Sequence, residues 1–65
     1  MEDQWQKIKA FLLSEECQDI HKMIWEDFAM LTDKNGKRYK VKAAQSLEEV
    51  IDILAKIRIV NRRLE

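Results

Sequence analysis

Apolar residues recur at helical spacing on both sides of Gly36, the only glycine in a chain that has no proline. The set before this glycine, with steps of three and four residues, consists of Cys17, Ile20, Ile24, Phe28 and Leu31. The set after it, with the same period, consists of Leu47, Val50, Ile51, Leu54, Ile57 and Leu64. Such spacing places the side chains of each set on one face of a helix, so the pattern predicts two amphipathic α-helices.

A shorter helix is predicted over residues 3–13, with a break at Ser14. Its apolar side is formed by Trp5, Ile8, Phe11 and Leu12. At about 100° per residue, an unbroken helix would turn this side far from the stripe of Ile20, Ile24 and Phe28. Ser14 is a typical N-cap, and Glu15 and Glu16 follow it in the first turn, where the helix dipole favours carboxylates. We therefore expect the second helix to run from Glu15 to about Thr32.

The segment Asp33-Lys34-Asn35-Gly36 is predicted to end this helix, because Asn or Gly adopts the left-handed conformation of a C-terminal cap. The same residues also suit a β-hairpin in which residues 28–32 and 38–42 pair as strands, with Tyr39 and Val41 on one face. The helical stripe that continues through Leu31 favours the helix over the hairpin.

The last helix begins with a capping box, Ser46-Leu47-Glu48-Glu49, in which the Ser46 and Glu49 side chains each accept a hydrogen bond from the other's backbone amide. It continues to about Leu64 without a helix breaker. Asn61 interrupts its apolar side. This residue either specifies the register of a helix pair or marks where the helix frays into solvent.

Together these elements predict an all-α fold. The expected architecture is one domain over residues 1–65 with three helices, the second and third antiparallel. The alternative is an α+β fold with a β-hairpin at about 28–42.

The length of the chain, 65 residues, predicts self-association. A domain this short buries only about 60% of its unfolded surface, so its own core leaves it marginally stable. An intrachain disulfide cannot supplement the core, because Cys17 is the only cysteine. A homodimer is the simplest remaining way to cover the apolar side chains.

Charge is divided along the chain although the formal net charge is zero. Residues 1–33 hold three basic and eight acidic residues, and residues 34–65 hold nine basic and four acidic residues. The two parts are therefore expected to attract each other, within one copy or between two antiparallel copies.

Residues 1–13 carry Glu2, Asp3, Lys7 and Lys9 and lack the uninterrupted apolar stretch of an export signal. No apolar run approaches the roughly 20 residues that a membrane-spanning helix needs. We expect a cytoplasmic protein without a membrane association, of the size typical of small bacterial or phage proteins.

Candidate chemistry is sparse. On a helix, Cys17 and His21 would lie one turn apart, and two copies could together hold zinc. One chain supplies only these two ligands, and Cys is commonly buried as a small apolar residue, so we assign no metal site and leave a shared one open. We identify no catalytic residues and no cofactor, and we expect a protein that is not an enzyme.

The apolar residues left beside the stripes predict a surface for binding a protein or a second copy. The predicted contact residues are Met23, Trp25, Phe28, Ile53, Ile59 and Val60. The segment 34–42 adds a charged contact through Lys37, Arg38, Tyr39 and Lys40. We thus expect a stoichiometric regulator or inhibitor that binds through a helical apolar surface. The alternative is a nucleic-acid-binding module that uses the basic segment, with lysines on phosphates and Tyr39 stacked on a base.

Overall fold

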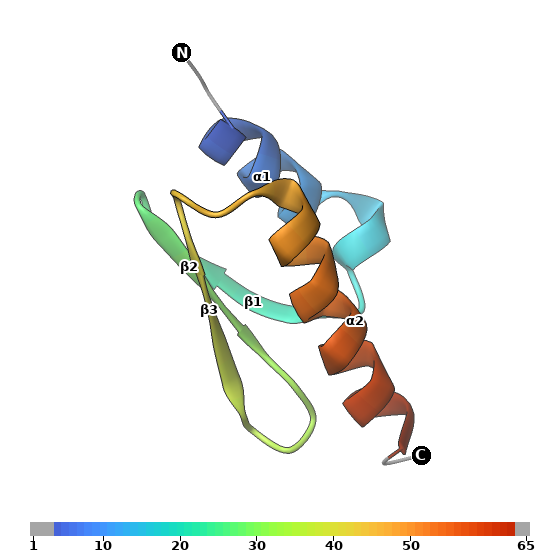
Figure 1. Cartoon of the computed structure of the whole chain (residues 1–65). Coiled ribbons are helices and arrows are strands. Elements are labelled where there is room, and N and C mark those ends of the chain that lie inside the picture. The colour runs from blue at the N-terminus through green and yellow to red at the C-terminus, as the bar shows by residue number, and fades with distance from the viewer. Residues whose placement is uncertain (1–3, 64–65) are drawn as a thin grey trace.

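The computed structural model describes residues 4–63 and shows an α+β fold (Figure 1). The elements in chain order are α1 (Gln4–Leu13), the 3-10 helix η1 (Glu15–Cys17), β1 (His21–Ile24), β2 (Phe28–Thr32), β3 (Arg38–Lys42) and α2 (Leu47–Arg63). Both α-helices lie on the same side of the antiparallel sheet, so the molecule has a helical layer and a sheet layer. Among residues 4–63, no helix has the length and apolar character required to cross a membrane.

The all-α prediction of a three-helix bundle is wrong, and so is the predicted pair of antiparallel helices. Residues 15–32 do not form a long helix; they form η1, β1 and β2. The hairpin at 28–42 that we set aside is present, and β1 extends it to three strands. The apolar positions fitted a helical period because β1 and β2 carry apolar side chains on both of their faces, which removes the polar–apolar alternation typical of a half-buried strand.

The sheet has the order β1-β2-β3, with both neighbouring pairs antiparallel. Ala29 lies between Ile24 of β1 and Val41 of β3, while Leu31 lies between Lys22 and Tyr39. Because side chains alternate between the two faces of a strand, these six residues share the face that is covered by the helices.

The core lies between this face and the helical layer. Its buried members are Ile8, Leu12, Cys17, Ile20, Ala29, Leu31, Val41, Val50, Leu54 and Ile57. Burial of one large aliphatic side chain contributes about 1.5–3 kcal/mol, so the larger members dominate the stability of the fold. Cys17 and Ile20 are in the core as the sequence pattern required, but they reach it from η1 and the bend after it rather than from a helix face.

The predicted first helix is confirmed as α1 over Gln4–Leu13, while residue 3 lies outside the described residues. Ser14 does not cap a following α-helix; its hydroxyl donates to the Phe11 carbonyl at 2.6 Å and so closes the end of α1. At the other end, the Trp5 indole N–H donates to the Glu26 carbonyl at 2.7 Å. This bond attaches α1 to the β1–β2 turn.

The capping box of α2 is confirmed. The Ser46 amide donates to Glu49 Oε1 at 3.0 Å, and the Glu49 amide donates to Ser46 Oγ at 3.3 Å. Near the other end of α2, Asn61 Oδ1 accepts from the Lys34 amide at 2.8 Å. Asn61 therefore has a role that the sequence did not suggest, because it ties α2 to the β2–β3 turn.

The β2–β3 turn is built around the carboxylate of Asp33, which is buried with 6% exposure. Its Oδ1 accepts from the amides of Asn35 and Lys37, both at 2.9 Å, and its Oδ2 accepts from the Tyr39 hydroxyl at 3.0 Å. Gly36 has a φ of 87°, a left-handed conformation that glycine adopts without steric cost. The left-handed residue expected at the end of a helix thus serves a β-turn instead.

Asp33 and Asp19 make stability depend on pH. Burial alone would raise the pKa of Asp33, but the hydrogen bonds from Lys37, Tyr39 and Asn35 outweigh it and lower this pKa. The hydrogen bonds from Arg58 lower the pKa of Asp19. A carboxyl whose pKa is lower in the folded than in the unfolded chain stabilises the fold above its unfolded pKa, about 3.9 for Asp, and this contribution is lost as the pH falls through the folded pKa.

We therefore expect the thermal unfolding midpoint to fall as the pH is lowered from about 4 to about 2. Circular dichroism melts at several pH values measure this change. Asp33→Asn should show a smaller decrease than the wild type, whereas Asp27→Asn, at the tip of the β1–β2 turn, should retain the wild-type profile. An equal decrease in all three proteins would contradict the assignment to Asp33.

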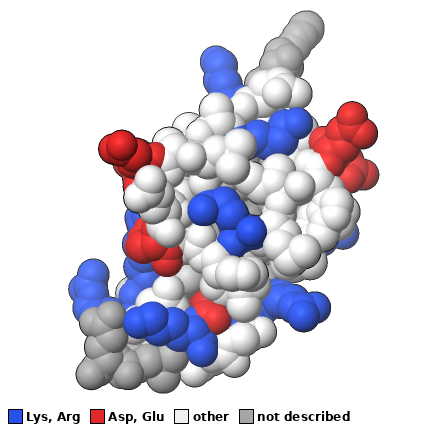
Figure 2. All heavy atoms as spheres, turned by 180° about the vertical axis from the view of Figure 1, so that it is seen from behind, with Lys and Arg blue, Asp and Glu red and all other residues white. Residues whose placement is uncertain are grey.

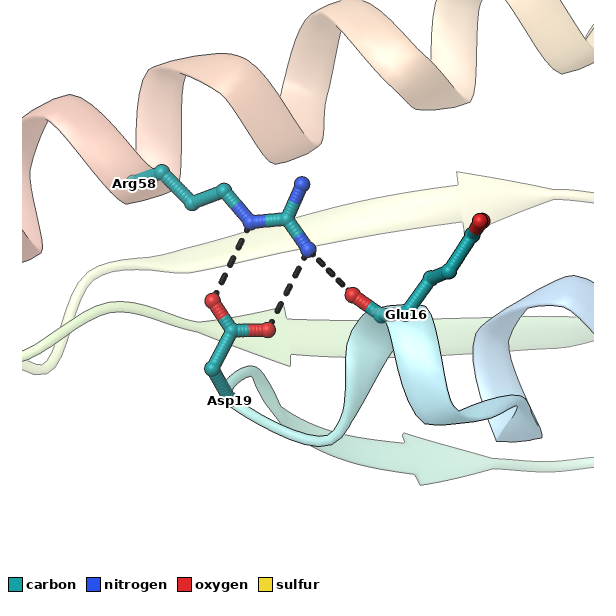
Figure 3. A network of polar contacts seen from close by, with 3 residues as sticks. All are labelled: Glu16, Asp19 and Arg58. Atoms are coloured by element: carbon teal, nitrogen blue, oxygen red, sulfur yellow. Dashed lines mark hydrogen bonds and ion pairs between the residues drawn. The ribbon is translucent and has the colours of Figure 1, made fainter.

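Arg58 connects α2 to the segment around η1 (Figure 3). Its Nε and Nη2 donate to the two carboxylate oxygens of Asp19, both at 3.1 Å, and Nη2 also donates to the Glu16 carbonyl. The hydrogen bonds with Asp19 raise the pKa of Arg58. This planar, bidentate pairing joins the acidic part of the chain to the basic part within one copy, as the division of charge allowed.

Candidate functional site

The face of the sheet that the helices leave uncovered is the candidate functional site, and we call it the open sheet face. It follows from the strand register, in which Met23 pairs with Met30 and Met30 pairs with Lys40. Its residues are His21, Met23, Phe28, Met30, Thr32, Arg38, Lys40 and Lys42, with Trp25 adjoining at the end of β1.

The open sheet face is apolar at its centre. Met23 is 52% exposed and Trp25 is 41% exposed. The Trp25 and Phe28 rings are stacked, with centroids 4.7 Å apart and an interplanar angle of 17°. The Trp25 amide also donates to the Phe28 carbonyl at 2.8 Å, which closes a tight hairpin around these two rings. Because the two rings restrain each other by stacking, little side-chain entropy would be lost when a ligand covers them.

The charged groups of the open sheet face are all basic. Arg38, Lys40 and Lys42 alternate along β3, so their side chains lie on the same face about 6–7 Å apart along the strand. The Lys40 ammonium lies 4.8 Å from the centroid of the Phe28 ring, a cation–π distance. No acidic residue occupies this face within the described part of β1, β2 and β3.

Seen from behind, the molecule shows a basic group near the centre of the view and further basic groups around it, among uncharged residues, while most acidic groups lie nearer the margins (Figure 2). On the open sheet face, a groove is lined by side chains from all three strands, among them Met23, Met30 and Arg38. It also includes Trp25 and Gly36, which lie near the opposite turns of the sheet. The groove therefore combines apolar contact area with a guanidinium.

The structure brings together five residues that the sequence had assigned to two separate contacts. Met23, Trp25 and Phe28 were predicted on a helical surface, and Arg38 and Lys40 in a basic segment. All five lie on or beside the open sheet face because β3 pairs with β2. The predicted helical surface is wrong for Met23, Trp25 and Phe28, which lie on or beside β1 and β2. Arg38 and Lys40, predicted in a loop, lie on β3.

The other predicted contact residues lie elsewhere. Ile53 packs against the core, Val60 is half-buried and Ile59 is 56% exposed on α2, in the helical layer. Tyr39 lies on the covered face, where its hydroxyl donates to Asp33, so its ring is not placed to stack on a base. Lys37 lies in the turn, with its ammonium 5.3 Å from the Tyr39 ring.

The predicted contact residues did not include four residues of the site, His21, Met30, Thr32 and Lys42, although Lys42 ends the basic segment 34–42 of the nucleic-acid alternative. A signal for two of them was present in the sequence, because residues 38–42 alternate basic and uncharged side chains and because Met30 lies two residues from Phe28 on the strand that the hairpin alternative required. His21 and Thr32 gave no signal, since their pairing depends on β1.

The geometry does not support the premise of a zinc site at Cys17 and His21. The two residues do not share a helix: Cys17 ends η1 and is buried in the core, while His21 begins β1 and is exposed on the open sheet face. Burial raises the pKa of the Cys17 thiol, which disfavours the thiolate that binds metal. Within residues 4–63, no three His, Cys, Asp or Glu residues are grouped to hold a metal ion.

No protein-family model matches this chain, and neither a curated protein nor a solved structure is significantly similar to it.

Proposed function

We propose that the protein acts by binding rather than by catalysis, and that its open sheet face binds a protein segment carrying apolar and acidic side chains. The observation that carries this proposal is the composition of the face, where exposed Met and Trp side chains lie beside the basic groups of β3 and none of the described strand residues on the face is acidic. Apolar side chains would fill the groove between Met23 and Met30, and carboxylates would pair with the cations of β3.

The side chains favour a protein partner. Methionine adapts its shape to varied apolar partners, and Trp and Arg are the residues that most often dominate the affinity of protein interfaces. Trp25, Met23 and Arg38 supply these types around one groove. Binding of this kind is stoichiometric, which suits a regulator or inhibitor. The proposal places the protein in the cytoplasm, where a free thiol such as Cys17 is ordinary.

A second candidate ligand is single-stranded nucleic acid, and one observation favours it. The row of Arg38, Lys40 and Lys42 beside an exposed tryptophan ring has the cation and aromatic components of such sites. The protein-binding proposal is preferred because the methionines offer no flat ring for a base and because the Phe28 ring already contacts Trp25 and Lys40.

The test selects randomised displayed peptides on the immobilised protein and then measures the affinity of the selected peptides by fluorescence anisotropy. The selected sequences should combine aromatic or aliphatic residues with Asp or Glu. Met23→Glu should weaken their binding about thirtyfold, or ~2 kcal/mol, because it puts a carboxylate in the apolar part of the groove. Circular dichroism verifies that the variant is folded, which the 52% exposure of Met23 favours.

The matched control is Ile59→Glu, which introduces the same carboxylate at an exposed apolar position of the helical layer. It should leave peptide affinity unchanged. The proposal would be refuted if Met23→Glu bound the selected peptides as tightly as the wild type, or if the selected sequences lacked acidic residues. Titration with oligothymidylate at two salt concentrations tests the second candidate, since salt-sensitive oligonucleotide binding without peptide binding would identify nucleic acid as the ligand.

A further inference from the structure

An apolar stripe on α2 points away from the core. Ile51 is 46% exposed, Ile59 is 56% exposed, and Leu47 is 36% exposed, with Ala55 also exposed between the two isoleucines. These four residues follow one another at steps of four along the helix, so they form one ridge. The buried residues Val50, Leu54 and Ile57 face the core instead.

The charges beside this stripe change sign along the helix. Glu48 and Asp52 precede Ala55, and Lys56 and Arg62 follow it, and all four side chains are exposed. None of the four forms an ion pair with another residue in the described range 4–63. The face is therefore acidic at one end, apolar in the middle and basic at the other end.

We propose that two copies of the chain associate through this face of α2, antiparallel, around a twofold axis at Ala55. The face is complementary to itself only in this orientation. Ile51 and Ile59 each lie four residues from Ala55, about 6 Å along the helix. Ile51 of one copy therefore meets Ile59 of the other copy, and the reverse contact follows by symmetry. Glu48 and Arg62 each lie seven residues from Ala55, about 10 Å, and therefore face each other across the axis.

The physical chemistry of this arrangement supports the antiparallel orientation. A small residue at the axis lets two helices approach closely, to interaxial distances of about 8–10 Å. The partner's Lys56 lies two residues from the position that Asp52 directly faces. Asp52 is therefore within side-chain reach of this lysine. A parallel pair would instead bring Glu48 against Glu48 and Arg62 against Arg62, which repel.

The dimer would leave the open sheet face free. The stripe residues are exposed, and α2 lies over the covered face of the sheet (Figure 1), so two copies joined through their helices would keep their two open sheet faces exposed. Pairing through the open sheet faces would set the cations of one β3 against those of another. A contact that involves four short or medium side chains per copy is small, so the association is concentration-dependent.

Sedimentation equilibrium of the full chain, from about 10 μM to about 1 mM, measures this association. The average mass should rise from 7.8 kDa toward twice that value. Glu48→Arg and Arg62→Glu should each weaken the association about tenfold, because each turns two symmetric attractions into repulsions. The doubly reversed variant should recover it, and an equimolar mixture of the two single variants should associate as heterodimers.

Recovery in the double variant can only arise between copies, because Glu48 and Arg62 are about 21 Å apart along one helix. Ile59→Glu should abolish association, whereas Met23→Glu on the open sheet face should leave it unchanged. The reverse result, with Met23→Glu monomeric and Ile59→Glu associated, would overturn the proposal, as would a folded monomer at every concentration. Since Met23→Glu and Ile59→Glu have opposite expected effects on peptide binding and self-association, failure of one proposal is distinguishable from failure of the other.

Discussion

Replacing Leu54 with alanine is expected to remove about half of the stability of this fold. Leu54 is 1% exposed and lies in the core between α2 and the sheet. Leucine-to-alanine substitutions at buried sites cost about 2–5 kcal/mol, since they lose apolar burial and leave a cavity. At about 0.05–0.15 kcal/mol per residue, the whole stability of a chain of this length is about 3–10 kcal/mol.

Urea denaturation followed by circular dichroism measures this loss at 25 °C. The matched control is Leu13→Ala, at the end of α1, where the side chain is 70% exposed. The same chemical change should there alter the unfolding free energy by less than about 0.5 kcal/mol. Equal losses at the two positions would show that the core is not where the structure places it.

Replacing Asp33 with alanine is expected to lower the thermal unfolding midpoint by about 10 °C or more. The substitution removes the acceptor of three hydrogen bonds at once and leaves the Tyr39 hydroxyl and two turn amides without it. Amide hydrogen exchange should accelerate at Asn35 and Lys37 more than in α1, because the turn opens locally before the core unfolds.

Two controls separate the turn from a general effect of losing a carboxylate. Asp27→Ala, in the β1–β2 turn, should change the midpoint by only a few degrees. Tyr39→Phe removes one of the three hydrogen bonds and should fall between the wild type and Asp33→Ala. A stability of Asp33→Ala equal to that of Asp27→Ala would contradict the role assigned to the turn.

The wrong prediction of a helix over residues 15–32 and the open sheet face have the same cause, which is that β1 and β2 carry apolar side chains on both faces. Leu31 and Ala29 are apolar because they enter the core, whereas Met23, Met30 and Phe28 are apolar on the other face of the same strands. A strand with two apolar faces shows no alternation, so single-sequence reasoning assigns the more periodic helix. The apolar side chains that removed this alternation, Met23, Phe28 and Met30, belong to the candidate site.

The sequence by itself determined the local elements whose signals act over a few residues. The capping box begins α2, the apolar period of residues 5–12 forms α1, and the single glycine occupies the left-handed position of a turn. Only the tertiary structure decided that residues 21–32 are strands, because strand pairing is non-local: β1 gains its hydrogen bonds from β2, and β2 from β3. The same pairing placed the basic row of β3 beside the apolar side chains of β1 and β2, a juxtaposition that no spacing along the chain encodes.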